Sequence, residues 1–126
     1  MKGIVYLCAL SKMSRVPKED NNFFMTTRKN AKLKDARQTF ELAPSPELFY
    51  MYNSVWKNHP HENWWDAYKE EYMKTVDMGF IHDLCDGLDL GHNITLMCYC
   101  GNDAYCHRSI LRDIFSSRGY TCIEIR

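Results

Sequence analysis

The sequence lacks three features that often indicate a function directly: a net charge, a long apolar run and internal repeats. Its sixteen basic and sixteen acidic side chains cancel, so no overall electrostatic field attracts the chain to nucleic acid or to an anionic membrane. The apolar run near the N-terminus, residues 4–10, is far too short to span a membrane, and no signal-peptide cleavage site follows it. We therefore expect a cytoplasmic protein without membrane contact, in which any phosphate or nucleotide binding comes from a local site.

Low-complexity tracts are also missing, and the size of the chain is that of one domain. With 126 residues, 45% of them hydrophobic and 25% charged, the composition is that of an ordinary globular protein. Residues 1–126 are therefore expected to close a single hydrophobic core. The oligomeric state is left open.

Six cysteines could form three disulfide bridges, but their surroundings argue against a disulfide framework. Cys8, Cys85, Cys98 and Cys122 stand inside apolar segments, where free cysteines are commonly buried. Disulfide frameworks are typical of small secreted domains. We therefore expect reduced thiols, in agreement with a cytoplasmic location.

Apolar patterns predict four strands. They are expected at residues 4–10, 23–27, 93–100 and 120–125, where β-branched, aromatic and other apolar residues cluster. Residues 29–43 are basic and irregular, and are expected to form a loop.

Capping residues and apolar stripes predict four helices. The first runs from Ser45, a capping hydroxyl followed by proline and an acid, to about residue 57. The second has its cap at Asn63 and an apolar stripe, and a third covers residues 79–86. The last starts near residues 104–107 and stops at Gly119. The stripe of the second helix consists of Trp65, Tyr68, Tyr72 and Val76.

A strand, a helix and a strand follow one another in the last thirty or so residues, which predicts a βαβ unit with a parallel strand pair. The expected fold class is therefore α/β: a single small domain with a mainly parallel sheet, flanking helices and a C-terminal βαβ unit. The Trp and Tyr residues of the second helix are expected to pack in the core rather than to stack on bases.

One loop concentrates chemically active residues. Cys98, Cys100, Cys106, His107 and Arg108 lie within residues 98–108, between the third strand and the last helix. Ligands of parallel sheets collect beyond the carboxyl ends of strands, where helix N-termini point.

The start of the last helix could favour negative charge. With Asp103 as the N-cap, Cys106 would lie in the first turn, where the helix dipole, Arg108 and a protonated His107 all favour a thiolate. The same exposed amides, together with Arg108, would hold a phosphate or a carboxylate.

Simpler explanations of the loop stay open. Cys98 and Cys100 could be buried structural thiols, and Arg108 could be a solvated helix residue. Zinc is not expected, because the spacing C-x-C-x5-C-H matches neither common zinc pattern and adjacent helical residues diverge by about 100°. A C-x5-R phosphatase loop is excluded, because Asn102 stands six residues before Arg108. We therefore expect no metal and no cofactor.

The segment "LMCYCGNDAYCHRSIL" resembles the C-terminal signature of the family catalogued as domain of unknown function 488. In that resemblance Cys98 and Cys106 take the places of two family cysteines, and Cys106, His107 and Arg108 match a Cys-His-Arg triplet. Further similar segments are "IVYLCALSKMSRVP", "FFMTTRKN", "LAPSPEL" and "WWDAYKEEYMKTV". Ala104 and Cys100 depart from the family pattern, which usually has proline and often an acid there.

The resemblance implies a compact α/β domain in which Arg28, Cys98, Cys106 and Arg108 converge at strand ends. Our leading hypothesis is a pocket for a small anion, a nucleotide or a phosphorylated metabolite. Arg28 and Arg108 would bind the anion, with further contacts from Cys98, Asp103, Tyr68 and Glu71.

In this hypothesis Cys106 is a nucleophile or a redox thiol, and His107 is an acid or a base. A non-catalytic protein that binds a ligand or a partner with the same basic pocket, and a purely structural module, are the alternatives. Whether the protein is an enzyme is therefore open.

Overall fold

The computed structural model describes residues 1–28, 33–99 and 105–126, which form an α/β domain with a five-stranded sheet. All strand pairs are parallel, in the order β3-β2-β4-β1-β5. The predicted fold class is confirmed. The strands are β1 (Ile4–Ala9), β2 (Asn21–Met25), β3 (Ala36–Gln38), β4 (Asn93–Cys98) and β5 (Thr121–Ile125).

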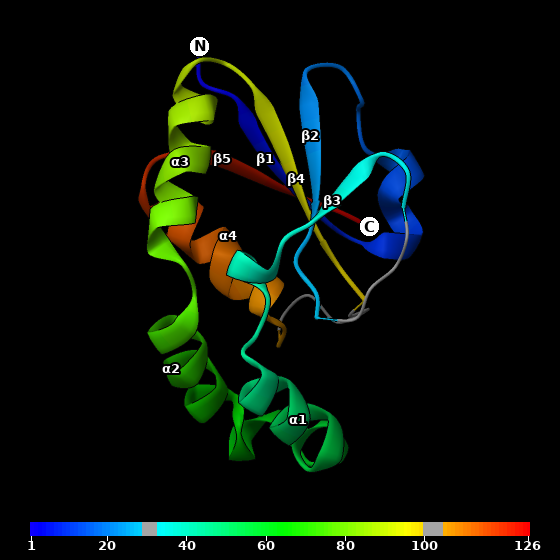
Figure 1. Cartoon of the computed structure of the whole chain (residues 1–126), viewed down its shortest axis with the longest axis vertical. Helices are drawn as coiled ribbons and strands as arrows, with labels where there is room; N and C mark the ends of the chain where they lie inside the picture. The colour runs from blue at the N-terminus through cyan, green and yellow to red at the C-terminus, as the bar shows by residue number, and fades with distance from the viewer. Residues whose placement is uncertain (29–32, 100–104) are drawn as a thin grey trace.

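Helices flank the sheet and extend beyond one end of it (Figure 1). The α-helices are α1 (Pro46–Ser54), α2 (Trp65–Thr75), α3 (Met78–Asp89) and α4 (His107–Ser117). Short 3-10 helices are η1 (Leu10–Arg15), η2 (Phe40–Leu42), η3 (Trp56–Asn58) and η4 (His61–Asn63). The predicted C-terminal βαβ unit is β4-α4-β5. Its two strands are parallel but do not pair with each other as expected, because β1 lies between them and pairs with both.

The two faces of the sheet pack in different ways. Val5 and Leu7 of β1 belong to the main core, which α2, α3 and α4 cover. Cys8, on the opposite face, packs in a smaller cluster with Val16 and with side chains of η1. This alternation is the period of two that a β-strand imposes. Both faces are covered, as expected for a parallel sheet.

Two segments differ from the sequence prediction. The expected loop at residues 29–43 contains the short edge strand β3 and the helix η2. β3 has only exposed and half-buried residues, so no apolar pattern marked it. The predicted cap of α2 at Asn63 is wrong. The N-cap of α2 is Trp64, whose side chain makes no capping hydrogen bond. The predicted cap of α1 is confirmed, since Ser45 Oγ accepts from Leu48 N at 3.1 Å.

Helices α1 and α2 lie beyond the carboxyl ends of the strands (Figure 1). The apolar stripe of α2 is largely core, with Tyr68 and Tyr72 buried. The Tyr72 hydroxyl donates to the Leu42 carbonyl at 2.7 Å, and Asp77 N donates to Glu41 O at 3.0 Å. These bonds tie α2 and the start of α3 to η2, the short helix after β3.

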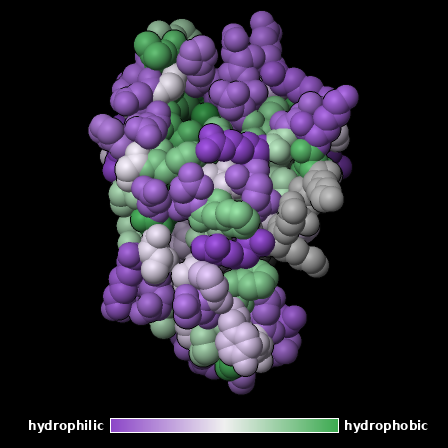
Figure 2. Space-filling view, viewed as in Figure 1, coloured by the Kyte–Doolittle hydropathy of each residue, from purple (hydrophilic) through white to green (hydrophobic). Residues whose placement is uncertain are grey.

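In the described ranges, no helix combines the length and the apolar character that a membrane crossing requires. Figure 2 shows one face of the molecule, where hydrophilic residues predominate and apolar residues form small groups.

Candidate functional site

A cavity of about 250 Å³ opens at the carboxyl end of the sheet. Its floor comes from the end of β4 and the start of α4, and its sides come from the segment after β2 and from α1 and α2. This is the place where parallel sheets usually bind ligands. The lining residues are Thr27, Arg28, Pro44, Phe49, Tyr52, Asn53, Tyr68, Cys98, Tyr99, Tyr105, Cys106 and His107.

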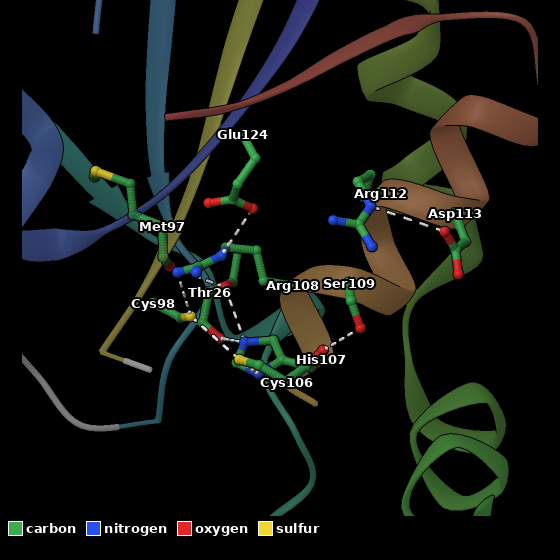
Figure 3. A network of polar contacts seen from close by, with 10 residues as sticks. All are labelled: Thr26, Met97, Cys98, Cys106, His107, Arg108, Ser109, Arg112, Asp113 and Glu124. Carbon is green, nitrogen blue, oxygen red and sulfur yellow. Dashed lines mark hydrogen bonds and ion pairs between the residues drawn. The ribbon is translucent and has the colours of Figure 1, made fainter. Parts of the chain in front are cut away.

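Strand alternation and register bring the chemically active residues to one place. Phe24 pairs with Leu96, and Leu7 pairs with both Leu96 and Glu124, so these side chains share the helix-covered face. Two residues further along β2 and β4, the same face carries Thr26 and Cys98. The first turn of α4 packs against them, as Figure 3 shows.

Helix α4 begins at His107, and Cys106 is its N-cap, with an extended backbone (φ −137°, ψ 153°). The sequence prediction had Asp103 as the cap and Cys106 inside the first turn. Asp103 lies outside the described residues, but the cap position belongs to Cys106. Ser109 N and Ser109 Oγ both bond to the Cys106 carbonyl at 2.9 Å, which fixes the turn. Cys106 therefore stays beside the N-terminal amides of α4, where the helix dipole favours negative charge.

The two family-type cysteines are in direct contact. Cys98 Sγ and Cys106 Sγ are 3.3 Å apart, and the residues are 0% and 2% exposed. Arg108 Nη1 donates to Cys98 Sγ at 3.3 Å (Figure 3). A guanidinium that donates to sulfur stabilises negative charge on the sulfur pair.

His107 is held in one tautomer. Its Nε2 lies 2.6 Å from the Thr26 carbonyl oxygen, which can only accept, so Nε2 carries the proton. The Thr26 hydroxyl donates to the Met97 carbonyl at 3.0 Å and offers its lone pairs to Nε2 at 2.9 Å. Nδ1 is then an acceptor, and it lies 3.6 Å from Cys106 Sγ. Burial lowers the pKa of His107 below its usual 6.5, so the imidazole is neutral near pH 7 and can act as a base.

Arg108 lies behind Cys98 and is not part of the cavity lining. Its Nε lies 3.3 Å from Glu124 Oε1, and the two side chains are 3% and 10% exposed. The carboxylate compensates the buried cation and orients the guanidinium toward Cys98. Arg28 instead is among the lining residues, so the cavity takes one of the two arginines that were expected to share it.

The other site residues from the sequence hypothesis fall into two groups. Arg28 and Tyr68 line the cavity, and Arg28 Nε donates to the Pro44 carbonyl at 2.8 Å. Glu71 lies on the exposed side of α2, where it pairs with Lys74 at 3.1 Å, so the structure does not bring it to the cavity. Of the thiols expected in the core, Cys122 is only half-buried.

Sequence reasoning missed Thr26 and Glu124, which orient His107 and Arg108. Glu124 left a signal, because an acid inside the apolar segment "YTCIEI" needs a buried partner. The aromatic wall of Phe49, Tyr52 and Tyr105 carried no comparable signal. Within the described residues, no group of three or more His, Cys, Asp or Glu side chains is arranged to hold a metal ion.

Fold and site together define a class: a small parallel α/β domain with a buried cysteine pair, a histidine and an arginine at the floor of a strand-end cavity. The family model DUF488-N3a, described as the active DUF488-N3 subclade, matches residues 6–119. The chain belongs to this family. No curated protein and no solved structure matches it.

Proposed function

We propose that this protein is a thiol-dependent enzyme that binds a small anionic metabolite, such as a nucleotide or another phosphorylated compound, in the strand-end cavity. One observation carries the proposal: Cys106 lines the cavity, and its Sγ lies 3.6 Å from the unprotonated Nδ1 of a histidine whose Nε2 is held by a backbone carbonyl. A thiol is activated when a base lies beside it and a third group orients that base. Here Cys106, His107 and the Thr26 carbonyl take these three places.

The chemistry follows from the proton positions. His107 Nδ1 takes the proton of the Cys106 thiol, and the sulfur then attacks an electrophilic atom of the bound ligand. The imidazolium that forms keeps its Nε2–H bond to the Thr26 carbonyl, which stabilises the new charge. A positioned general base of this kind contributes roughly 10²–10⁴-fold to a rate.

The lining defines the kind of ligand. Arg28 supplies a planar cation that suits a phosphate or a carboxylate. Phe49, Tyr52 and Tyr105 supply aromatic walls, and Asn53 supplies an amide that can donate and accept. The volume of about 250 Å³ is small for a ligand site. These features favour a small ligand with one anionic group and one planar or apolar part.

Limited alkylation with iodoacetamide, mapped by mass spectrometry, tests the thiol. Cys106 should be labelled faster than the other thiols, and in the His107→Gln variant its labelling rate should fall to that of the others. Burial raises the pKa of Cys8 and of Cys122 to about 11, so these thiols should react slowly. Cys122→Ser is the matched control and should leave Cys106 labelling unchanged. Equal labelling of Cys106 and Cys122 would refute the proposal.

A non-catalytic binding protein is the alternative, because it needs the same cavity. A thermal-shift screen of nucleotides and phosphorylated metabolites identifies ligands, and incubation with each hit then separates the two functions. The enzyme should change the mass of its ligand, and Cys106→Ser should bind it but leave it unchanged. If the wild-type protein binds its ligands and leaves all of them chemically unchanged, the non-catalytic binding function is favoured.

A further inference from the structure

We infer that Cys98 is a second reactive thiol, and that the site reduces small anionic disulfides while Cys98 and Cys106 become a disulfide. The inference rests on the proposed function, because it requires Cys106 to be the attacking thiol. It names what the sequence hypothesis left open, the reaction type and the role of the second cysteine.

The two sulfurs are in contact, as a pair that forms a disulfide must be. They are 3.3 Å apart, whereas a disulfide has a bond of about 2.0 Å, so an approach of about 1.3 Å closes it. Cys98 and Cys106 are both among the residues that line the cavity, so a substrate sulfur bound to Cys106 would lie close to Cys98. A purely structural thiol needs no such contact.

The guanidinium of Arg108 also favours a reactive Cys98. Arg108 is nearly fully buried and is held by Glu124 on the far side from the cysteines (Figure 3). Its Nη1 donates to Cys98 Sγ, and this donation favours the thiolate that must attack Cys106. Glu124 therefore acts as a positioning residue for Cys98, through Arg108.

The reaction balances with a disulfide R–S–S–R′ as the oxidant. The Cys106 thiolate attacks one substrate sulfur, a Cys106–S–R bond forms, the S–S bond breaks, and R′S⁻ takes the proton held by His107. Cys98 then attacks Cys106 Sγ, the Cys98–Cys106 bond forms, and RS⁻ leaves with the proton that Cys98 gave up. Two protein thiols are oxidised and one disulfide is reduced to two thiols. A small-molecule dithiol restores the reduced pair.

3,3′-Dithiodipropionate, a small anionic disulfide, is a suitable probe, and cystamine, which has the same spacer length and is cationic, is its charge-reversed control. The full chain is incubated with either compound, and the products are read by intact mass and by peptide mapping. Wild-type protein should lose two hydrogens and yield a Cys98–Cys106 linked peptide. Cys98→Ser should stop with one mercaptopropionate in disulfide linkage to Cys106, and Cys106→Ser should give neither product. Cys122→Ser should behave as wild type, and 3,3′-dithiodipropionate should react faster than cystamine because of Arg28.

The outcomes separate the two proposals. If iodoacetamide labels Cys106 rapidly but wild-type protein accumulates the mixed disulfide and never the Cys98–Cys106 peptide, the inference is overturned and the thiol enzyme stands. If Cys106 reacts with neither reagent, both proposals are overturned. The variant Glu124→Gln tests the role of Glu124. The mixed disulfide on Cys106 should form at the wild-type rate, whereas the Cys98–Cys106 disulfide should form more slowly.

Discussion

The buried pair Arg108–Glu124 allows a quantitative test of how the site is held. At a separation of 3.3 Å, two unit charges in surroundings of effective dielectric constant 20 attract each other by about 5 kcal/mol. Desolvation of both groups offsets much of this attraction. Removal of one partner leaves the other buried without its counter-charge, at a cost of about 3–5 kcal/mol. Arg108→Met and Glu124→Met should each destabilise the fold by that order.

Removal of both partners should cost less than the sum of the two single changes. The double variant Arg108→Met/Glu124→Met leaves no uncompensated charge, and the coupling energy should be about 2–3 kcal/mol. Arg108→Met should be the more costly single change, because it also removes the bond from Nη1 to Cys98 Sγ. Urea unfolding of the four proteins under reducing conditions, followed by circular dichroism, gives the free energies, provided the m-values agree.

The neighbouring pair Arg112–Asp113 is the matched control. Its Nε–Oδ1 distance is 3.9 Å, and its side chains are 33% and 80% exposed, so its coupling should stay below about 0.5 kcal/mol. If the costs of Arg108→Met and Glu124→Met add within about 0.5 kcal/mol, the reasoning is refuted. Glu124 would then not hold the guanidinium on Cys98.

Three further predictions concern other parts of the domain. Burial lowers the pKa of His107 below 6.5, so as the pH falls the imidazole is protonated in the unfolded state before it is protonated in the folded state. The unfolding free energy should therefore be flat above pH 6.5 and fall below it, by up to about 1.4 kcal/mol per pH unit. His107→Gln should lack this component, which a comparison of urea midpoints between about pH 5 and pH 8 would reveal. Arg28→Gln should weaken phosphate binding by about tenfold or more, measured by calorimetry, whereas Arg15→Gln, a surface control bonded to a terminal carbonyl, should not. Tyr72→Phe should lower the free energy of unfolding in urea by about 1–3 kcal/mol, because it removes the buried 2.7 Å bond to the Leu42 carbonyl. An unchanged midpoint would show that this bond adds no net stability.

Local patterns were enough to predict most elements. The apolar runs of β1, β4 and β5 and the capping hydroxyl of Ser45 act over a few residues, so they can be recognised in a linear sequence. The βαβ unit followed from the order of its elements, because parallel strands need a crossover connection. The insertion of β1 between β4 and β5 did not follow from that order. Helix boundaries were predicted less closely: α3 begins one residue earlier than expected and ends at Asp89, three residues beyond the expected end. The edge strand β3 has no buried residue and could not be recognised.

The sequence by itself determined that Cys106, His107 and Arg108 are neighbours at the start of a helix beyond a strand. Only the tertiary structure decided what each of them faces. Thr26 reaches His107 across 81 residues of sequence through the pairing of β2 with β4, and Glu124 reaches Arg108 because β5 pairs beside β1. Such partners depend on strand order and register, which arise when distant apolar segments bury each other, and no local pattern encodes them.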